Sequence, residues 1–231
     1  MRDLFPDLDR TVFIVTYGRS GSTLVQNMLN ALPATCIRGE NENLLAPLAR
    51  AWDMLRHSPN RQRARATTPG QPWYGIEAVT PEGFGAALAR SFATEVLRPP
   101  PGTRIAGFKE IRWHSDPALF PVMLDFLRDF FPQAQFLFNL RDHEAVMRSG
   151  WWQHMPKAEV RRSLTRAEAL YADYAARHPQ CCLTLRYEDY VQSAQAWEPV
   201  FQFLGTPFDA ALAERVLAEK LTHLQARRPA G

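Results

Sequence analysis

Cysteine is scarce in this sequence, and long hydrophobic runs are absent. The 231 residues include only three cysteines, Cys36, Cys181 and Cys182, of which two are adjacent. This odd number and spacing indicate neither a disulfide framework nor a zinc site, so a reducing compartment fits best. No run approaches the roughly 18 apolar residues that span a membrane, and from the acidic, proline-containing start we expect no signal peptide. We therefore expect a cytoplasmic protein that has no membrane partner.

A large excess of either charge is also missing. The sequence has 27 basic and 24 acidic residues, which gives a net charge of +3. This balance argues against nucleic acid as a partner, because nucleic-acid binding usually needs a strongly basic face. The histidines show no metal-ligand spacing and no acidic cluster suggests a magnesium site, so no metal is expected. Hydrophobic residues make up 46% of the chain, which is enough for a core and excludes disorder as the main state.

Short apolar runs alternate with longer amphipathic ones, and this pattern is typical of an α/β domain with a parallel sheet. Strands are expected at residues 11–16, 35–38, 104–109, 134–140 and 182–186. Helices are expected at residues 22–32, 42–55, 81–97, 117–131, 143–149, 158–177 and, as one or two helices, 194–221. We therefore predict a single domain over residues 1–231. Its fold is a three-layer αβα arrangement with a central, mostly parallel sheet of about five strands.

Residues 56–80 have no periodicity and are rich in arginine, proline and glycine. We expect an irregular excursion over the surface, and long loops of this kind often serve as lids over a substrate. Trp73 and Tyr74 could support a sugar ring or a phenol, and the arginines could attract an acidic acceptor. The alternative is that the arginines are simply solvated, which is the usual fate of such residues.

A turn rich in glycine and serine connects the first strand to the first helix. Six residues carry its chemistry: Gly18, Arg19, Ser20, Gly21, Ser22 and Thr23. Backbone N–H groups of such a turn, together with the helix N-terminus, form a concave anion site. The glycines permit the tight backbone path, and the hydroxyls and the fixed positive charge of Arg19 suit phosphate or sulfate oxygens. The alternative is an ordinary turn in which Ser22 caps the helix.

The turn differs from the loop of nucleotide triphosphatases, which requires a lysine directly after its last glycine. In this sequence Ser22 follows Gly21. Residues 19–23, Arg-Ser-Gly-Ser-Thr, instead resemble the 5′-phosphosulfate loop of sulfotransferases that use 3′-phosphoadenosine 5′-phosphosulfate (PAPS). The match is to the arginine version, which is found in carbohydrate and protein-tyrosine sulfotransferases.

Two further segments resemble the same family. Residues 136–142 form an apolar strand that ends in Arg141, and Ser149 follows eight positions later, as in the family's 3′-phosphate site. Tyr187 begins a Tyr-Glu-Asp sequence that the family often carries, and its ring either packs near the adenosine or belongs to the core. One departure is the absence of the Arg-Lys-Gly-Gly loop of cytosolic relatives. We do not assign its role to Arg227 or Arg228.

The resemblance implies a P-loop-like fold, PAPS as the sulfuryl donor, no metal, and a hydroxyl of a carbohydrate or small-molecule acceptor. Arg19 would serve the bridging and leaving oxygens. Glu40, in a Gly-Glu pair like that of tyrosylprotein sulfotransferases, would be the general base. Lys109 ends a strand and either reaches the sulfuryl oxygens or lies on the surface.

Several alternatives remain open at this point. Glu40 could instead supply charge at the N-terminus of the following helix, in which case Glu42 or His114 would be the base. The chain could also be a P-loop kinase of a small molecule, or a nucleotide-binding relative without catalysis. The oligomeric state is not predicted.

Overall fold

The centre of the structure is a five-stranded parallel sheet. The computed structural model describes residues 1, 3–63, 65 and 67–226, with residues 220–226 as backbone alone. The strands lie in the order β2-β3-β1-β4-β5, and all neighbours pair in parallel. They are β1 (Arg10–Thr16), β2 (Thr35–Arg38), β3 (Ile105–Glu110), β4 (Ala134–Leu140) and β5 (Cys182–Arg186).

Strand β1 is buried on both faces. Successive side chains of a strand point to opposite faces of the sheet, so Phe13 and Val15 enter one hydrophobic core and Val12 and Ile14 enter another. Because a core lies on each face of the sheet, consecutive residues of this run are apolar. A continuous β-branched and aromatic run is what a central parallel strand requires.

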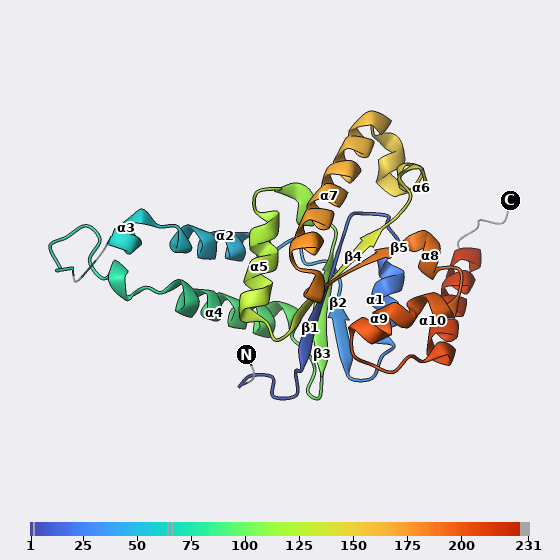
Figure 1. Cartoon of the computed structure of the whole chain (residues 1–231), viewed down its shortest axis with the longest axis horizontal. Helices are drawn as coiled ribbons and strands as arrows, with labels where there is room; N and C mark the ends of the chain where they lie inside the picture. The colour runs from blue at the N-terminus through green and yellow to red at the C-terminus, as the bar shows by residue number, and fades with distance from the viewer. Residues whose placement is uncertain (2, 64, 66, 227–231) are drawn as a thin grey trace.

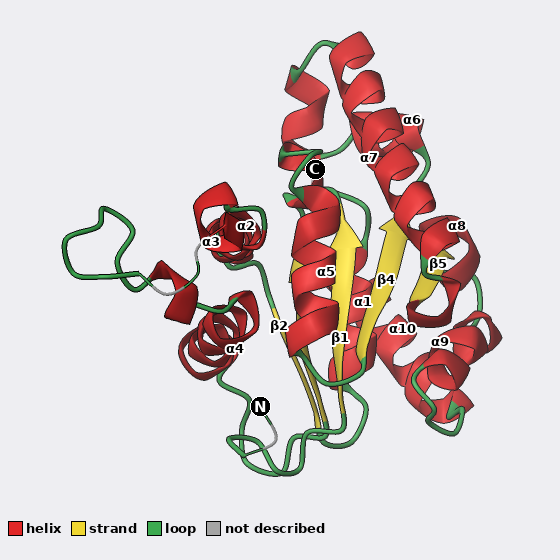
Figure 2. Ribbon diagram, turned by 60° about the vertical axis from the view of Figure 1, so that its left-hand side comes forward, coloured by secondary structure: helices red, strands yellow, loops and turns green. Residues whose placement is uncertain are grey.

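Helices cover both faces of the sheet, as Figure 2 shows, which confirms the predicted three-layer α/β fold. The first core is covered by α2 (Leu45–Arg56), α4 (Pro81–Phe92), α5 (Phe120–Phe130) and α7 (Lys157–Arg177). The second is covered by α1 (Ser22–Asn30), α8 (Tyr187–Tyr190), α9 (Glu198–Phe203) and α10 (Ala210–Ala226). The short helices α3 (Pro59–Arg63) and α6 (His143–Met147) complete the α-helices of the described residues.

Several helices begin or end away from their predicted residues. Helix α2 starts three positions late because Glu42 and Asn43 adopt positive φ angles of 58° and 56°. The helix expected at 143–149 ends at Met147, and Ser149 is extended before a 3₁₀ helix at Gly150–His154. Residues 56–80 are also more regular than predicted, since they contain α3 and a 3₁₀ turn at Ile76–Ala78.

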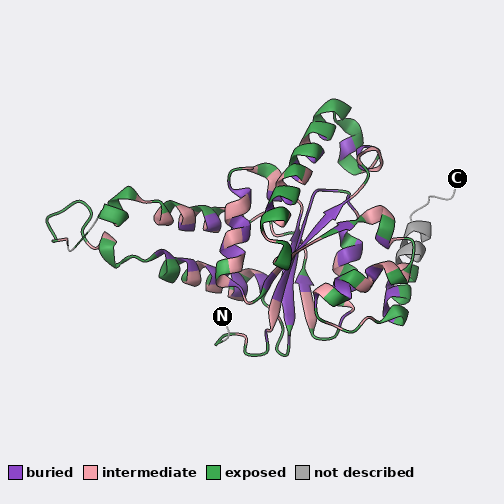
Figure 3. Ribbon diagram, in the orientation of Figure 1, coloured by how far each residue is buried: buried purple, intermediate pink, exposed green. Residues whose placement is uncertain are grey.

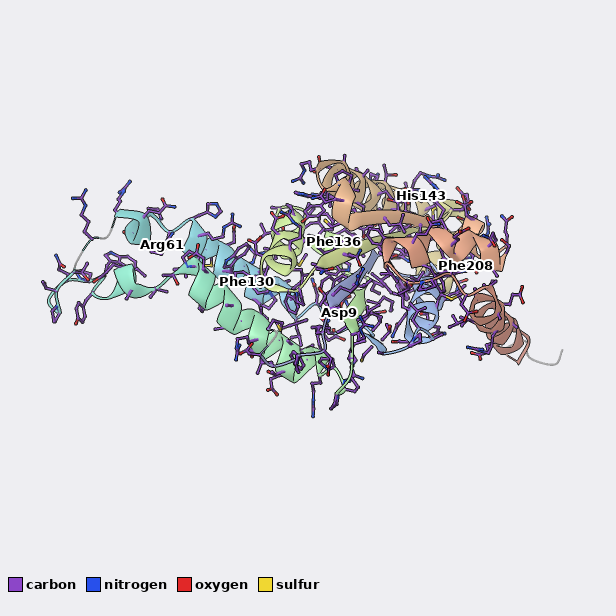
Figure 4. The ribbon with its side chains drawn as sticks, turned by 60° about the horizontal axis from the view of Figure 1, so that its bottom comes forward. Asp9, Arg61, Phe130, Phe136, His143 and Phe208 are labelled. Atoms are coloured by element: carbon purple, nitrogen blue, oxygen red, sulfur yellow. The ribbon has the colours of Figure 1, made fainter. Side chains whose placement is uncertain are left out.

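Helices α2 and α4 run side by side and project from the sheet as an arm (Figure 1). The segment between them lies at the outer end of the arm and is largely exposed (Figure 3). Figure 4 shows Arg61 on this arm, well apart from Phe136 of β4. No helix in the described part of the chain is long and apolar enough to cross a membrane. Arg227 and Arg228 lie outside the described residues.

Candidate functional site

The loop between β1 and α1 lies at the carboxyl ends of the central strands, where open α/β sheets bind ligands. Hydrogen bonds from the side chains of Thr16 and Asn139 hold this loop in place. Thr16 Oγ1 lies 2.7 Å from Ser20 Oγ and 2.7 Å from the carbonyl oxygen of Asn139, and Asn139 Nδ2 donates to the carbonyl oxygen of Ser20 at 3.1 Å. Arg19 and Gly21 have positive φ angles of 68° and 84°. The loop is therefore anchored by hydrogen bonds at the carboxyl ends of β1 and β4.

Aromatic rings enclose the loop on two sides. A Cβ atom on Gly18 would overlap the ring of Trp151, and one on Gly21 would overlap the ring of Tyr187. Trp152 Nε1 donates to the carbonyl oxygen of Gly18 at 2.9 Å. Both glycines are thus required by close approach of the rings.

Beside the loop is a cavity of about 570 Å³, which we name the loop cavity. It is lined by Gly18, Arg19, Gly21, Ser22, Thr23, Leu24, Asn27, Glu40, Lys109, Ile111, Arg141, Trp151, Tyr187, Val216 and Glu219. Ser20 does not line it, because its side chain is fully buried against Thr16. Most of the anion-binding residues that the sequence indicates therefore face one space.

Two arginines, Arg19 and Arg141, form one wall of the loop cavity, and Ser149, which does not line the cavity, is bonded to Arg19. Arg19 Nε donates to Ser149 Oγ at 2.9 Å, and Arg141 Nη1 donates to the carbonyl oxygen of Arg19 at 3.0 Å. The Arg141 guanidinium carbon lies 4.2 Å from the centre of the Tyr187 ring. Arg141 Nε is buried and has no hydrogen-bond partner. A buried donor without a partner is unfavourable, so this wall is suited to an anion that supplies the missing acceptor.

The main chain of Arg141 is fixed by Tyr17, a residue that the sequence did not single out. Tyr17 Oη accepts from the Arg141 N–H at 2.9 Å and donates to Glu168 at 2.7 Å. Burial, followed by the hydrogen bond to Glu168, raises the pKa of Tyr17 well above its ordinary value. The hydroxyl consequently stays protonated.

The Lys109–Glu40 ion pair forms another wall of the loop cavity. Lys109 Nζ lies 2.6 Å from Glu40 Oε1, and the lysine and glutamate side chains are 8% and 33% exposed. Arg112 Nη1 is 3.8 Å from Glu40 Oε2. Glu40 therefore lies between two basic side chains, which come from the end of β3 and the turn after it.

Glu110, the last residue of β3, organises this wall although it does not line the cavity. It is fully buried. Its Oε2 accepts backbone N–H groups of Asn41 and Asn43, and its Oε1 accepts those of Ile111 and Arg112. The segment that carries Glu40 is thereby tied to the turn that carries Arg112. A carboxylate at the end of an apolar strand was the only signal for this role in the sequence.

A second cavity of about 470 Å³ lies next to the first, and we name it the indole cavity. It is lined by Gly18, Glu40, Ile111, Arg112, His114, Ser115, Trp151 and Trp152. Four of these, Gly18, Glu40, Ile111 and Trp151, also line the loop cavity. Glu40 thus stands at the boundary between the two spaces.

His114 enters the indole cavity with one ring nitrogen engaged. The Tyr171 hydroxyl donates to the carbonyl oxygen of Thr16 at 2.9 Å and lies 3.3 Å from His114 Nδ1. Because the hydroxyl proton is used on Thr16, Nδ1 is the donor and Nε2 of His114 is left as a proton acceptor. Burial lowers the pKa of His114, which keeps the imidazole neutral near neutral pH.

Arg19, Glu40, Lys109 and Arg141 thus line the loop cavity, whereas Ser149 reaches it only through its hydrogen bond with Arg19, and His114 lines the adjoining indole cavity. None of the described residues between 56 and 80 lines either cavity, so a lid in that segment stays a prediction, as does the single domain. Among the described residues, no cluster of three or more His, Cys, Asp or Glu side chains could hold a metal ion.

Comparison with known proteins identifies the family. The family model described as the sulfotransferase family matches residues 11–210. Among solved structures, the sulfotransferase domain of the Synechococcus PCC 7002 olefin synthase is 23% identical with a TM-score of 0.55, and the match covers 89% of this chain and 76% of that one. The sulfotransferase domain of the curacin biosynthetic pathway is 16% identical with a TM-score of 0.58, covering 89% and 77%.

No curated protein matches the chain. At these identities, the likeness to solved structures supports the fold alone. The carbohydrate and protein-tyrosine branch suggested by the loop stays a prediction. The family model, in contrast, spans most of the sequence and both arginine motifs, and on that ground the chain belongs to the sulfotransferase family.

Proposed function

We propose that the protein transfers the sulfuryl group of PAPS to a hydroxyl group of a small-molecule or carbohydrate acceptor, with Glu40 as general base. Membership of the family supports sulfuryl transfer in general. The specific support for this donor is the wall formed by Arg19 and Arg141, with Ser149 bonded to Arg19. Arg141 carries most weight, because its buried Nε lacks a partner in a cavity lined by an anion-binding loop.

The residues of the loop cavity fit both anionic ends of such a donor. The loop backbone, Ser22, Thr23 and Arg19 would hold the 5′-phosphosulfate. Arg141 and Ser149 would hold the 3′-phosphate, which is the group that distinguishes this nucleotide from ATP. PAPS would supply a sulfuryl group that is already bonded to a phosphate leaving group.

The wall formed by Lys109 and Glu40 fits the transfer itself. The acceptor oxygen must lose a proton as its bond to sulfur forms, and negative charge grows on the leaving oxygen as the sulfur–oxygen bond breaks. Lys109 and Arg19 place positive charge beside the loop. Glu40 stands at the boundary of the two cavities, so an acceptor in the indole cavity can deliver its proton there.

His114 is the second candidate for the base. The lone pair on Nε2 and the lowered pKa leave the imidazole ready to accept a proton. Glu42 is a weaker candidate than either, because its side chain is 84% exposed and lines neither cavity. If the base is His114, Glu40 acts by holding Lys109.

Calorimetry with 3′-phosphoadenosine 5′-phosphate (PAP), AMP and ATP tests the donor. The protein should bind PAP more tightly than AMP, and Arg141→Ala and Ser149→Ala should remove the difference. Arg148→Ala, at an exposed neighbouring arginine, serves as the matched control and should bind PAP normally. Equal binding of PAP and AMP would refute the 3′-phosphate assignment, and preference for ATP would favour the kinase alternative.

The base is tested separately with Glu40→Ala and His114→Ala. The variant that lacks the base should bind PAP as the wild type does but should not turn over. Full activity of the Glu40→Ala variant would identify His114 as the base.

A further inference from the structure

The indole cavity offers an acceptor a flat apolar surface. Trp151, at the edge of the loop, is 48% exposed. Its ring packs against Gly18 and lies 5.9 Å, centre to centre, from that of Trp152. Ile111 adds further apolar lining. A planar ring placed on Trp151 would cover exposed apolar area while remaining next to Glu40.

The positive charge in the indole cavity is already neutralised. Arg112 Nη1 lies 3.3 Å from Glu110 and 3.8 Å from Glu40, and Arg112 Nη2 lies 3.7 Å from Glu42. Three carboxylates therefore surround one guanidinium. An acceptor that carries its own carboxylate or sulfate would have to compete with them and would meet their repulsion. The charges disfavour an anionic acceptor.

Most of the polar groups in this cavity are also engaged. Trp152 Nε1 is bonded to the loop, His114 Nδ1 to Tyr171, and Glu40 to Lys109. A sugar brings several hydroxyl groups that must each exchange water for a protein partner, and a polar group buried without one is unfavourable. The cavity provides few partners beyond the groups that the reaction itself needs.

We infer that the indole cavity is the acceptor site and that it takes an uncharged aryl alcohol whose ring lies on Trp151. This assignment rests on the proposed function. A phenol also suits the chemistry, because its ordinary pKa of about 10 makes its proton easier to remove than that of a sugar hydroxyl. The phenolic oxygen forms a bond to sulfur, its proton passes to Glu40 or His114, and the sulfur–oxygen bond to the phosphate breaks to release PAP.

Three matched probes test the acceptor class on the protein saturated with PAP. They are 2-naphthol, 6-hydroxy-2-naphthoate, which is the same ring with a carboxylate, and methyl β-glucoside. Ligand-observed NMR should show 2-naphthol binding at least about tenfold more tightly than either of the others. Tighter binding of the naphthoate, or binding of the glucoside as tight as that of 2-naphthol, would overturn the assignment.

The position of the ring is tested with Trp151→Ala and Trp151→Phe. The alanine variant should weaken 2-naphthol binding about tenfold and the phenylalanine variant should restore part of it. Phe84→Ala removes an exposed aromatic side chain of α4 that lines neither cavity and should change nothing. An unchanged affinity in Trp151→Ala would refute the stacking.

The affinity of every variant for PAP is measured in parallel. If the wild type does not bind PAP, the proposed donor is refuted. If it binds PAP but does not prefer 2-naphthol to the other two probes, only the acceptor class is refuted.

Discussion

Lys109 and Glu40 form an ion pair at 2.6 Å across the ends of two neighbouring strands, β3 and β2. The pair joins the residue that would stabilise the sulfuryl oxygens to the residue that would remove the acceptor proton. Both line the loop cavity. Neither the lysine nor the glutamate can be altered without changing the surroundings of its partner.

Lys109→Met should lower kcat about 100- to 1,000-fold, the usual effect of removing one donor that stabilises transition-state charge. The thermal midpoint should change little, because Glu40 is one-third exposed and water can solvate it. Steady-state release of PAP measures the rate, and calorimetry measures the midpoint. Lys157→Met, at an exposed lysine, is the control. A variant with more than one-tenth of normal kcat would remove Lys109 from the transfer step.

Gly21→Ala should destabilise the protein by about 1–3 kcal/mol and abolish PAP binding, because a left-handed backbone and a ring collide with the new methyl group. The φ angle is 84° and the Cβ would overlap Tyr187. Urea unfolding and calorimetry provide the two measurements. Gly39→Ala is the matched control, since its nearest neighbour would be 3.9 Å away. Normal PAP binding by Gly21→Ala would show that the ring contact is dispensable.

Glu110→Gln should cost about 1–3 kcal/mol of stability and lower activity, because an amide nitrogen would face backbone N–H groups that now meet a carboxylate oxygen. The four backbone donors come from both segments that shape the Glu40 wall. Unfolding in urea and the kcat of the variant measure the two effects. Glu95→Gln, at an exposed glutamate, should be neutral. Unchanged stability in Glu110→Gln would contradict the bridging role.

His114 should make stability depend on pH. Burial lowers its pKa below the ordinary value of 6.5, so as the pH falls below 6.5 the unfolded chain takes up a proton before the folded protein does. Stability is therefore fully present above the unfolded pKa and is lost as the pH falls from there toward the folded pKa. Urea unfolding of the wild type and His114→Gln at about pH 7.5 and about pH 5.5 measures this effect. The advantage of the wild type should shrink at the lower pH, and an equal difference at both would refute it.

Cys181 should be the most reactive cysteine. The hydrogen bond from Cys182, with Sγ atoms 4.0 Å apart, and then the charge of Arg128, lower the pKa of Cys181 to about 7, whereas the same hydrogen bond and burial raise the pKa of Cys182. Since the thiolate is the nucleophile, iodoacetamide at about pH 7.5 should label Cys181 first. Peptide mass spectrometry identifies the site. Faster labelling of Cys182 would show that Cys182, and not Cys181, is the thiol that loses its proton more easily.

The strands and the arginine motifs could be predicted because their signals are local. A buried parallel strand has an apolar run, and the spacing of Arg141 and Ser149 is visible in the sequence alone. The hydrogen bond from Arg141 Nη1 to the carbonyl oxygen of Arg19 joins the two motifs directly, and nothing in the sequence indicates that contact.

The roles of Trp151 and Glu110 could not be predicted, because each depends on what lies across space. Trp151 matters through its contact with Gly18, and Glu110 through backbone groups of a segment that follows another strand. The late start of α2 lies in the same segment: Asn43, whose N–H donates to Glu110, and Glu42 both adopt positive φ angles. Local propensity contains none of this information.

The hydrogen bonds that anchor the β1–α1 loop have a consequence for synthesis of the chain. The loop is made early, but the hydrogen bond from Trp152 to Gly18 joins positions 134 apart, and that from Tyr171 to Thr16 joins positions 155 apart. Contacts between residues so far apart in the sequence form late, because closing long loops is entropically unfavourable. A nascent chain on the ribosome therefore contains the loop sequence long before the loop can adopt its anchored conformation, which is complete only after α7 has emerged.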